Sequence, residues 1–126
     1  MKASVWASVA ALLAATSASA HHSVAGEFDT TRRTTLKGVI TKIDWTNPHT
    51  YVNLDVVDDK GTVTSWRLES LPIAMMRKAG MTPEKLLGGG GQVVANVLLA
   101  RDGVKHLAYL IKLTYEDNHH IQFTAD

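Results

Sequence analysis

The stretch LKGVITKIDWTNPHTYVNLDVVDDKG, residues 36–61, predicts two β-strands joined by a turn. Over residues 52–56 apolar side chains alternate with polar ones, which is typical of a half-buried strand. Asn47-Pro48 is a turn signal before this strand, and residues 58–61 carry the polar side chains and the glycine of a hairpin after it. The segment therefore favours antiparallel β-structure.

The first strand of this stretch begins at Leu36 and does not alternate evenly. Leu36 and Ile40 lie on one face of the strand, whereas Val39 and Ile43 lie on the other. Gly38 stands where a bulge would let the strand change faces. We therefore predict a long, bent first strand.

The elements that follow are spaced as in a small β-domain. They are a third strand around 66–68, a short amphipathic helix between Pro72 and Gly80, a helical turn over 82–87, strands over 92–100 and 105–115, and a tail strand over 121–123. This order is that of the OB-fold. We predict a mainly β, OB-like five-stranded Greek-key barrel with one short helix between strands three and four. A meander sheet with one packed helix is the alternative.

The N-terminus has the three parts of a secretory signal peptide. Lys2 is the positive start, residues 5–15 are apolar and alanine-rich, and Ala18-Ser19-Ala20 supplies small residues at the cleavage site. We predict a signal peptide over 1–20, an extended arm over 21–35 and the barrel over 36–126, in the periplasm or secreted. A buried N-terminal helix of a cytosolic domain is the alternative.

The composition and the missing motifs argue against several classes of protein. The 13 Lys and Arg residues nearly balance 12 Asp and Glu residues, which argues against a nucleic-acid binder. The chain has no cysteine and so offers no lipid-anchor acceptor, and the mature protein is expected to carry no membrane anchor. Nucleophile and zinc-protease motifs are missing, and the glycines at 88–91 are not followed by the Lys-Ser/Thr of a phosphate loop. We therefore expect a binding protein rather than an enzyme.

Several motifs together resemble one known family. These are HHS at 21–23, LKGVITKIDWTNPH at 36–49, the W-x-L-E strand at 66–69, P-x-A-x-x-R at 72–77 and the closing L-T strand. They are similar to small secreted bacterial proteins catalogued as a domain of unknown function, number 6152. The resemblance extends over nearly all of the mature chain, and WTNPH is its most specific part. It implies the same fold but no established activity.

The predicted cleavage makes His21 the first residue of the mature chain. An α-amine has a pKa of about 7.7–8.0, so the amine and the imidazole of His21 can chelate one metal ion together near neutral pH. One further imidazole would give an arrangement that resembles the histidine brace of secreted copper proteins, and nitrogen ligands suit Cu(II). We therefore predict copper as the cofactor. The alternative is that HHS is merely a polar start.

Three other histidines are candidate metal ligands. His49 is the strongest, because the turn between the first two strands borders the ligand face of OB-folds. His22 is the neighbour of His21, and His106 follows the turn between strands four and five, which borders the same face. The alternatives are a locally bonded turn histidine at His49 and an ordinary exposed turn around His106. The pair at 119–120 is expected to be a solvated hairpin.

A ligand-binding loop is predicted to comprise Trp45, Asn47, Pro48, His49 and Tyr51. Tyr51 should point outward, and Glu69 could orient a histidine by hydrogen bonding, although an ion pair with Arg67 or Arg77 is the alternative. Trp45 and Trp66 are expected to fill the barrel core rather than serve as stacking platforms.

Three hypotheses for function remain. The first is an exported copper-binding protein that uses His21 and His49. The second is a periplasmic barrel that binds a partner protein or a small ligand through the WTNPH loop, without metal. The third is a small oxidative copper enzyme, for which so short a chain leaves little substrate surface.

Overall fold

Strand β1 (Phe28–Asp44) is long and pairs with a different strand along each of its two edges. In the computed structural model, which describes residues 23–124, its first part pairs antiparallel with β4 (Gln92–Ala100) and its second part with β2 (Tyr51–Val57). The strand begins at Phe28 and not at Leu36, so the predicted extended arm is corrected for residues 28–35. The side chains of residues 28–35 are mostly exposed and polar, so the sequence shows no alternation of apolar and polar residues there. These residues belong to the strand because their backbone pairs with β4.

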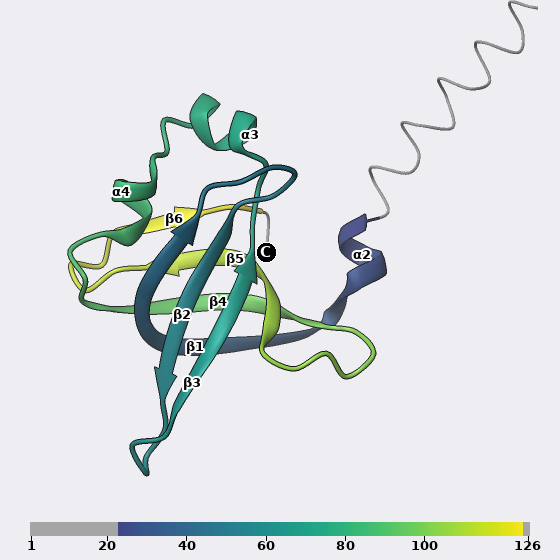
Figure 1. The fold of residues 1–126 in the computed structure, drawn as a ribbon, viewed down its shortest axis with the longest axis vertical. Helices are drawn as coiled ribbons and strands as arrows, with labels where there is room; N and C mark the ends of the chain where they lie inside the picture. Colours follow the sequence, from purple (N-terminus) through teal and green to yellow (C-terminus); the bar gives the residue numbers. More distant parts are fainter. Residues whose placement is uncertain (1–22, 125–126) are drawn as a thin grey trace, which may run out of the picture.

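A parallel contact closes the sheet into a barrel. β2 pairs antiparallel with β3 (Val63–Glu69), β4 pairs antiparallel with β5 (Leu107–Thr114), and β3 meets β5 in parallel through Arg67 and Leu107. This is the predicted OB-like barrel of five strands, and Figure 1 shows β1 curving around it. The short strand β6 (His120–Gln122) extends the sheet beyond β5.

Two short helices, rather than one, connect β3 to β4. They are α3 (Ile73–Lys78) and α4 (Pro83–Leu87), and Figure 1 shows both at the same end of the barrel. The Thr82 hydroxyl accepts a hydrogen bond from the Lys85 amide, as expected of an N-cap. The Tyr115 hydroxyl donates to the Leu86 carbonyl oxygen at 2.5 Å, and burial raises the pKa of Tyr115 to about 12. This bond ties α4 to the barrel.

The main core lies inside the barrel and uses one face of β1. Leu36 and Ile40 are buried, whereas Val39 is 40% exposed. The register shift in the β1–β2 pairing falls between Ile40 and Lys42, not at Gly38 where the sequence predicted a bulge. At Gly38 a Cβ atom would lie 2.2 Å from the Asp55 carbonyl oxygen, so glycine permits a close backbone approach.

The two tryptophans predicted for the barrel core lie at its edge. Trp45 and Trp66 are partly buried and pack against the core without entering it. The fully buried positions of the hairpin belong to smaller side chains, among them Val52, Leu54 and Leu68. The prediction is therefore corrected, because an interior lined by closely spaced strands leaves little room for an indole.

Helix α2 (Ser23–Glu27) covers a second apolar cluster on the outside of the barrel. The buried members of that cluster are Phe28, Leu98, Ala100, Tyr109 and Ile111, and Val24 packs against them. The Arg101 side chain donates to the Ala25 carbonyl oxygen at 2.9 Å, and its amide donates to that of Glu27 at 2.8 Å. Residues 23–27 are thus a docked helical turn and not an extended arm.

The predicted signal peptide, His21 and His22 lie outside the described residues. Within residues 23–124, no helix is long and apolar enough to cross a membrane.

Candidate functional site

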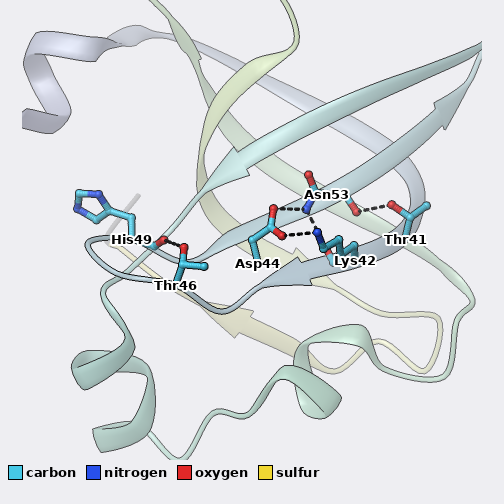
Figure 2. Close-up of polar contacts among 6 residues, drawn as sticks. All are labelled: Thr41, Lys42, Asp44, Thr46, His49 and Asn53. Atoms are coloured by element: carbon cyan, nitrogen blue, oxygen red, sulfur yellow. Dashed lines mark hydrogen bonds and ion pairs between the residues drawn. The ribbon is translucent and has the colours of Figure 1, made fainter.

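His49 lies in the loop between β1 and β2 and is held there by backbone contacts on both sides. The Thr46 hydroxyl donates to the His49 carbonyl oxygen at 3.3 Å, and the Thr50 amide donates to the Leu71 carbonyl oxygen at 3.0 Å. Figure 2 shows the imidazole projecting away from the strands and from the polar contacts around Asp44. The loop therefore presents the His49 ring at the barrel surface.

The side chain of His49 meets a buried carboxylate. His49 Nδ1 lies 3.0 Å from Glu69 Oε1, and the Glu69 side chain is only 7% exposed. Strand pairing produces this contact, because Tyr51 and Glu69 are opposite each other in β2 and β3. The structure therefore gives Glu69 the position expected of a residue that orients a histidine. Among the described residues it makes no ion pair with Arg67 or Arg77, the alternative considered above.

The His49–Glu69 contact defines which imidazole nitrogen is available. An ionised carboxylate only accepts hydrogen bonds, so a neutral His49 must donate through Nδ1–H. The lone pair then resides on Nε2, the nitrogen that points away from Glu69. Carboxylate–histidine pairs of this kind fix the tautomer and the ring orientation of metal-ligating histidines. His49 is thus suited to bind a metal ion or to accept a proton through Nε2.

Glu27, at the end of α2, also influences this pair. Burial is the largest cause that raises the pKa of Glu69, and the nearby Glu27 carboxylate raises it further, whereas His49 opposes the shift. The same Glu27 charge acts on the Tyr51 hydroxyl, whose pKa is raised chiefly by burial. The Glu27 carboxylate, at the end of α2, thus acts on both Glu69 and Tyr51.

Tyr51 points outward, as predicted, and is covered by an arginine. The Arg67 guanidinium lies 3.7 Å from the centre of the Tyr51 ring, within the range of a cation–π contact. The sequence analysis did not identify this pair. It could have been found by extending the 58–61 hairpin, since that register sets Arg67 diagonally across from Tyr51.

The remaining residues of the predicted ligand loop are arranged around a polar network. Asn47 and Pro48 are exposed, and Trp45 is half-buried against the core. At the end of β1, Asp44 accepts a hydrogen bond from Asn53 at 2.9 Å and pairs with Lys42, contacts drawn in Figure 2. These bonds, above all that from Asn53, lower the pKa of Asp44. The network anchors the end of β1 from which the loop departs.

His106 does not lie in the same cluster as His49 and Glu69; it contacts Trp66 instead. Its ring meets Trp66 edge-on, with 5.3 Å between ring centres and an angle of 70° between planes. His119 stacks on Tyr115 and pairs with Asp117 in the exposed turn before β6. In the described part of the chain, three or more His, Asp or Glu residues nowhere form a group that could hold a metal.

The fold and the site define a small OB-like barrel with an oriented histidine in the loop between β1 and β2. Residues 9–108 match a family of unknown function, DUF6152, and the chain belongs to that family. This confirms the resemblance noted from the WTNPH motif. The comparison with curated proteins found no match, and the comparison with solved structures found none.

Proposed function

We propose that this protein is exported to the periplasm or secreted, and that it binds a copper ion through His21 and His49 without catalysing a reaction. The observation that carries the proposal is the 3.0 Å contact between His49 Nδ1 and the buried Glu69 carboxylate. It leaves Nε2 free as a ligand in a fixed orientation.

The entry of the chain at α2 supports the same proposal. Glu27 acts electrostatically on Glu69, and Arg101 fixes the backbone of Ala25 and Glu27. In sequence, His21 precedes Glu27 by less than two helical turns, so its amine and imidazole are within reach of His49 in our proposal. These two nitrogens and the His49 nitrogen would form a three-nitrogen set suited to Cu(II).

The test is a Cu(II) titration of protein that begins at His21. We expect a tight one-to-one site that weakens by more than about tenfold when one residue is added before His21, because the chelating amine is then an amide. His49→Ala should weaken the site as well. His106→Ala and the double variant His119→Ala/His120→Ala are controls. The His106 ring contacts Trp66, the His119 ring contacts Tyr115 and Asp117, and His120 is exposed.

Affinity should also fall as the pH drops through the range of the imidazoles and the amine, because protons compete for the same lone pairs. Equal affinity with and without the added residue would contradict the proposed site. Affinity that merely follows the number of histidines would contradict it too.

A second candidate function is supported by the exposure of Asn47 and Pro48. These two residues project from a loop that is anchored by Asp44 on one side and Thr50 on the other. A rigid, exposed loop suits recognition of a protein partner or a small ligand. Under this alternative, Cu(II) binding would be weak, and substitution of Asn47 would abolish partner capture without changing the metal titration.

A further inference from the structure

A pocket of about 340 Å³ lies on a different part of the barrel from His49. It is formed by β3, the first part of β1, the end of β4, the 101–106 loop and the start of β5. Its apolar lining includes Trp66, Leu99, Val104 and Leu107, and the Val104 side chain is 53% exposed. The pocket thus offers an indole and aliphatic side chains that the protein leaves partly uncovered.

The rim of this pocket is cationic. Arg32 and Lys105 line it, and no carboxylate is among the lining residues. Neither cation forms an ion pair with another described residue. The Asp29 carboxylate, on which Arg32 has a small electrostatic effect, accepts its hydrogen bonds from the amide and the hydroxyl of Thr31. The two charges are therefore available to a ligand.

The loop that carries Lys105 is tied to β3 by backbone and ring contacts. Asp102, Gly103 and His106 all have positive φ angles, and the His106 carbonyl oxygen accepts a hydrogen bond from the Arg67 amide at 2.9 Å. The His106 ring in turn rests edge-on against Trp66. The wall of the pocket is thus preformed, which lowers the ordering cost of binding.

We propose that this pocket binds a small organic anion, namely a carboxylate with an aromatic or similarly apolar body. The ring would pack against Trp66, Leu99 and Val104, while the carboxylate faces Arg32 and Lys105. The volume lies near the lower end of small-molecule sites, which fits a single-ring ligand. This site shares no residue with the proposed copper site and does not depend on it.

The test uses 3-phenylpropionate with the full mature protein in the presence of a metal chelator. The signal of the Trp66 indole N–H, assigned with Trp66→Phe, is followed by two-dimensional NMR. We expect a saturable shift, with 3-phenylpropionamide and inorganic phosphate each binding at least about fivefold more weakly, since they lack the charge and the apolar body respectively.

Arg32→Gln and Lys105→Gln should each weaken binding by a factor of about two to five, and added salt should weaken it further. Arg33→Gln is the matched control, because this neighbour in β1 lines a separate groove. The proposal is overturned if the amide or phosphate binds as well as the acid, if no saturable shift occurs, or if Arg33→Gln has the same effect as Arg32→Gln.

Discussion

Glu69 is the only charged residue buried within residues 23–124, and it lies at a strand end where other polar groups are enclosed as well. The hydroxyls of Thr50 and Ser70 on neighbouring positions are buried and have no hydrogen-bond partner among the described residues. Proteins generally avoid such arrangements, because each enclosed polar group costs free energy unless it is satisfied. Retaining a carboxylate here is therefore expensive for stability, which fits a role in orienting His49.

This cost should depend on pH. Because the pKa of Glu69 is raised, the folded state holds the Glu69 proton more tightly than the unfolded state does. The stabilising contribution of the protonated form is thus complete below the unfolded value of about 4.3 and is lost as the pH rises through the folded value. In Glu69→Gln this loss is absent. As the pH rises over that range, the unfolding free energy of Glu69→Gln should therefore increase relative to that of the wild type.

Urea unfolding followed by tryptophan fluorescence at several pH values from 4 upward measures this difference. Asp59→Asn, at an exposed position of the β2–β3 turn, is the control for the loss of a carboxylate at the surface. A pH-independent difference for Glu69→Gln would show that ionisation of Glu69 costs the fold nothing.

At the scale of elements, β1 and β2 approach each other closely at Gly38. Gly38 faces the Asp55 carbonyl oxygen so closely that even a methyl group has no room. The missing side chain at Gly38 thus permits this approach, next to the buried Leu36 and Ile40.

We predict that Gly38→Ala lowers the unfolding free energy by about 1–3 kcal/mol or more, since the added methyl must push the two backbones apart. Gly26→Ala in α2 is the matched control, because a Cβ there would contact nothing within 4 Å. Thermal and urea unfolding of both variants would measure the effect. Similar stability of the two variants would mean that the β1–β2 approach is not tight.

Much of this arrangement could be predicted from sequence, because alternation and turn chemistry are local signals. The strands at 52–56 and 92–100, the Thr82-Pro83 helix start and the outward Tyr51 all follow from patterns a few residues long. The first part of β1 could not be predicted, since its order comes from pairing with β4, far away in the chain. The edge position of Trp66 likewise depends on the space left by other strands. From the sequence, Glu69 could either contact a histidine or pair with Arg67 or Arg77. The β2–β3 register, which sets Tyr51 opposite Glu69, places it beside His49.

At the scale of the whole molecule, the proposed copper site depends on correct processing. Its first ligand exists only if the chain is cleaved between Ala20 and His21, because an upstream residue converts the amine into an amide. Export and metal binding are thus one linked proposal.

We predict that the protein recovered from the periplasm or the medium begins at His21, as measured by intact mass spectrometry. Ala18→Asp or Ala20→Asp should block cleavage, since signal peptidase reads small residues at these positions. Recovery of folded protein that still carries Met1 would contradict both the cleavage site and the metal site that relies on it.

The parallel contact between β3 and β5 has a consequence for how the chain folds. It joins Arg67 to Leu107, while β1 joins Phe28 to Ala100, so the barrel closes only through pairings between distant parts of the chain. Such non-local topologies reach their transition states slowly, because loop-closure entropy is lost before the contacts form. A chain emerging from the ribosome cannot complete the barrel until β5 has been synthesised. The pairing of β3 with β5 therefore forms only after most of the chain has been made.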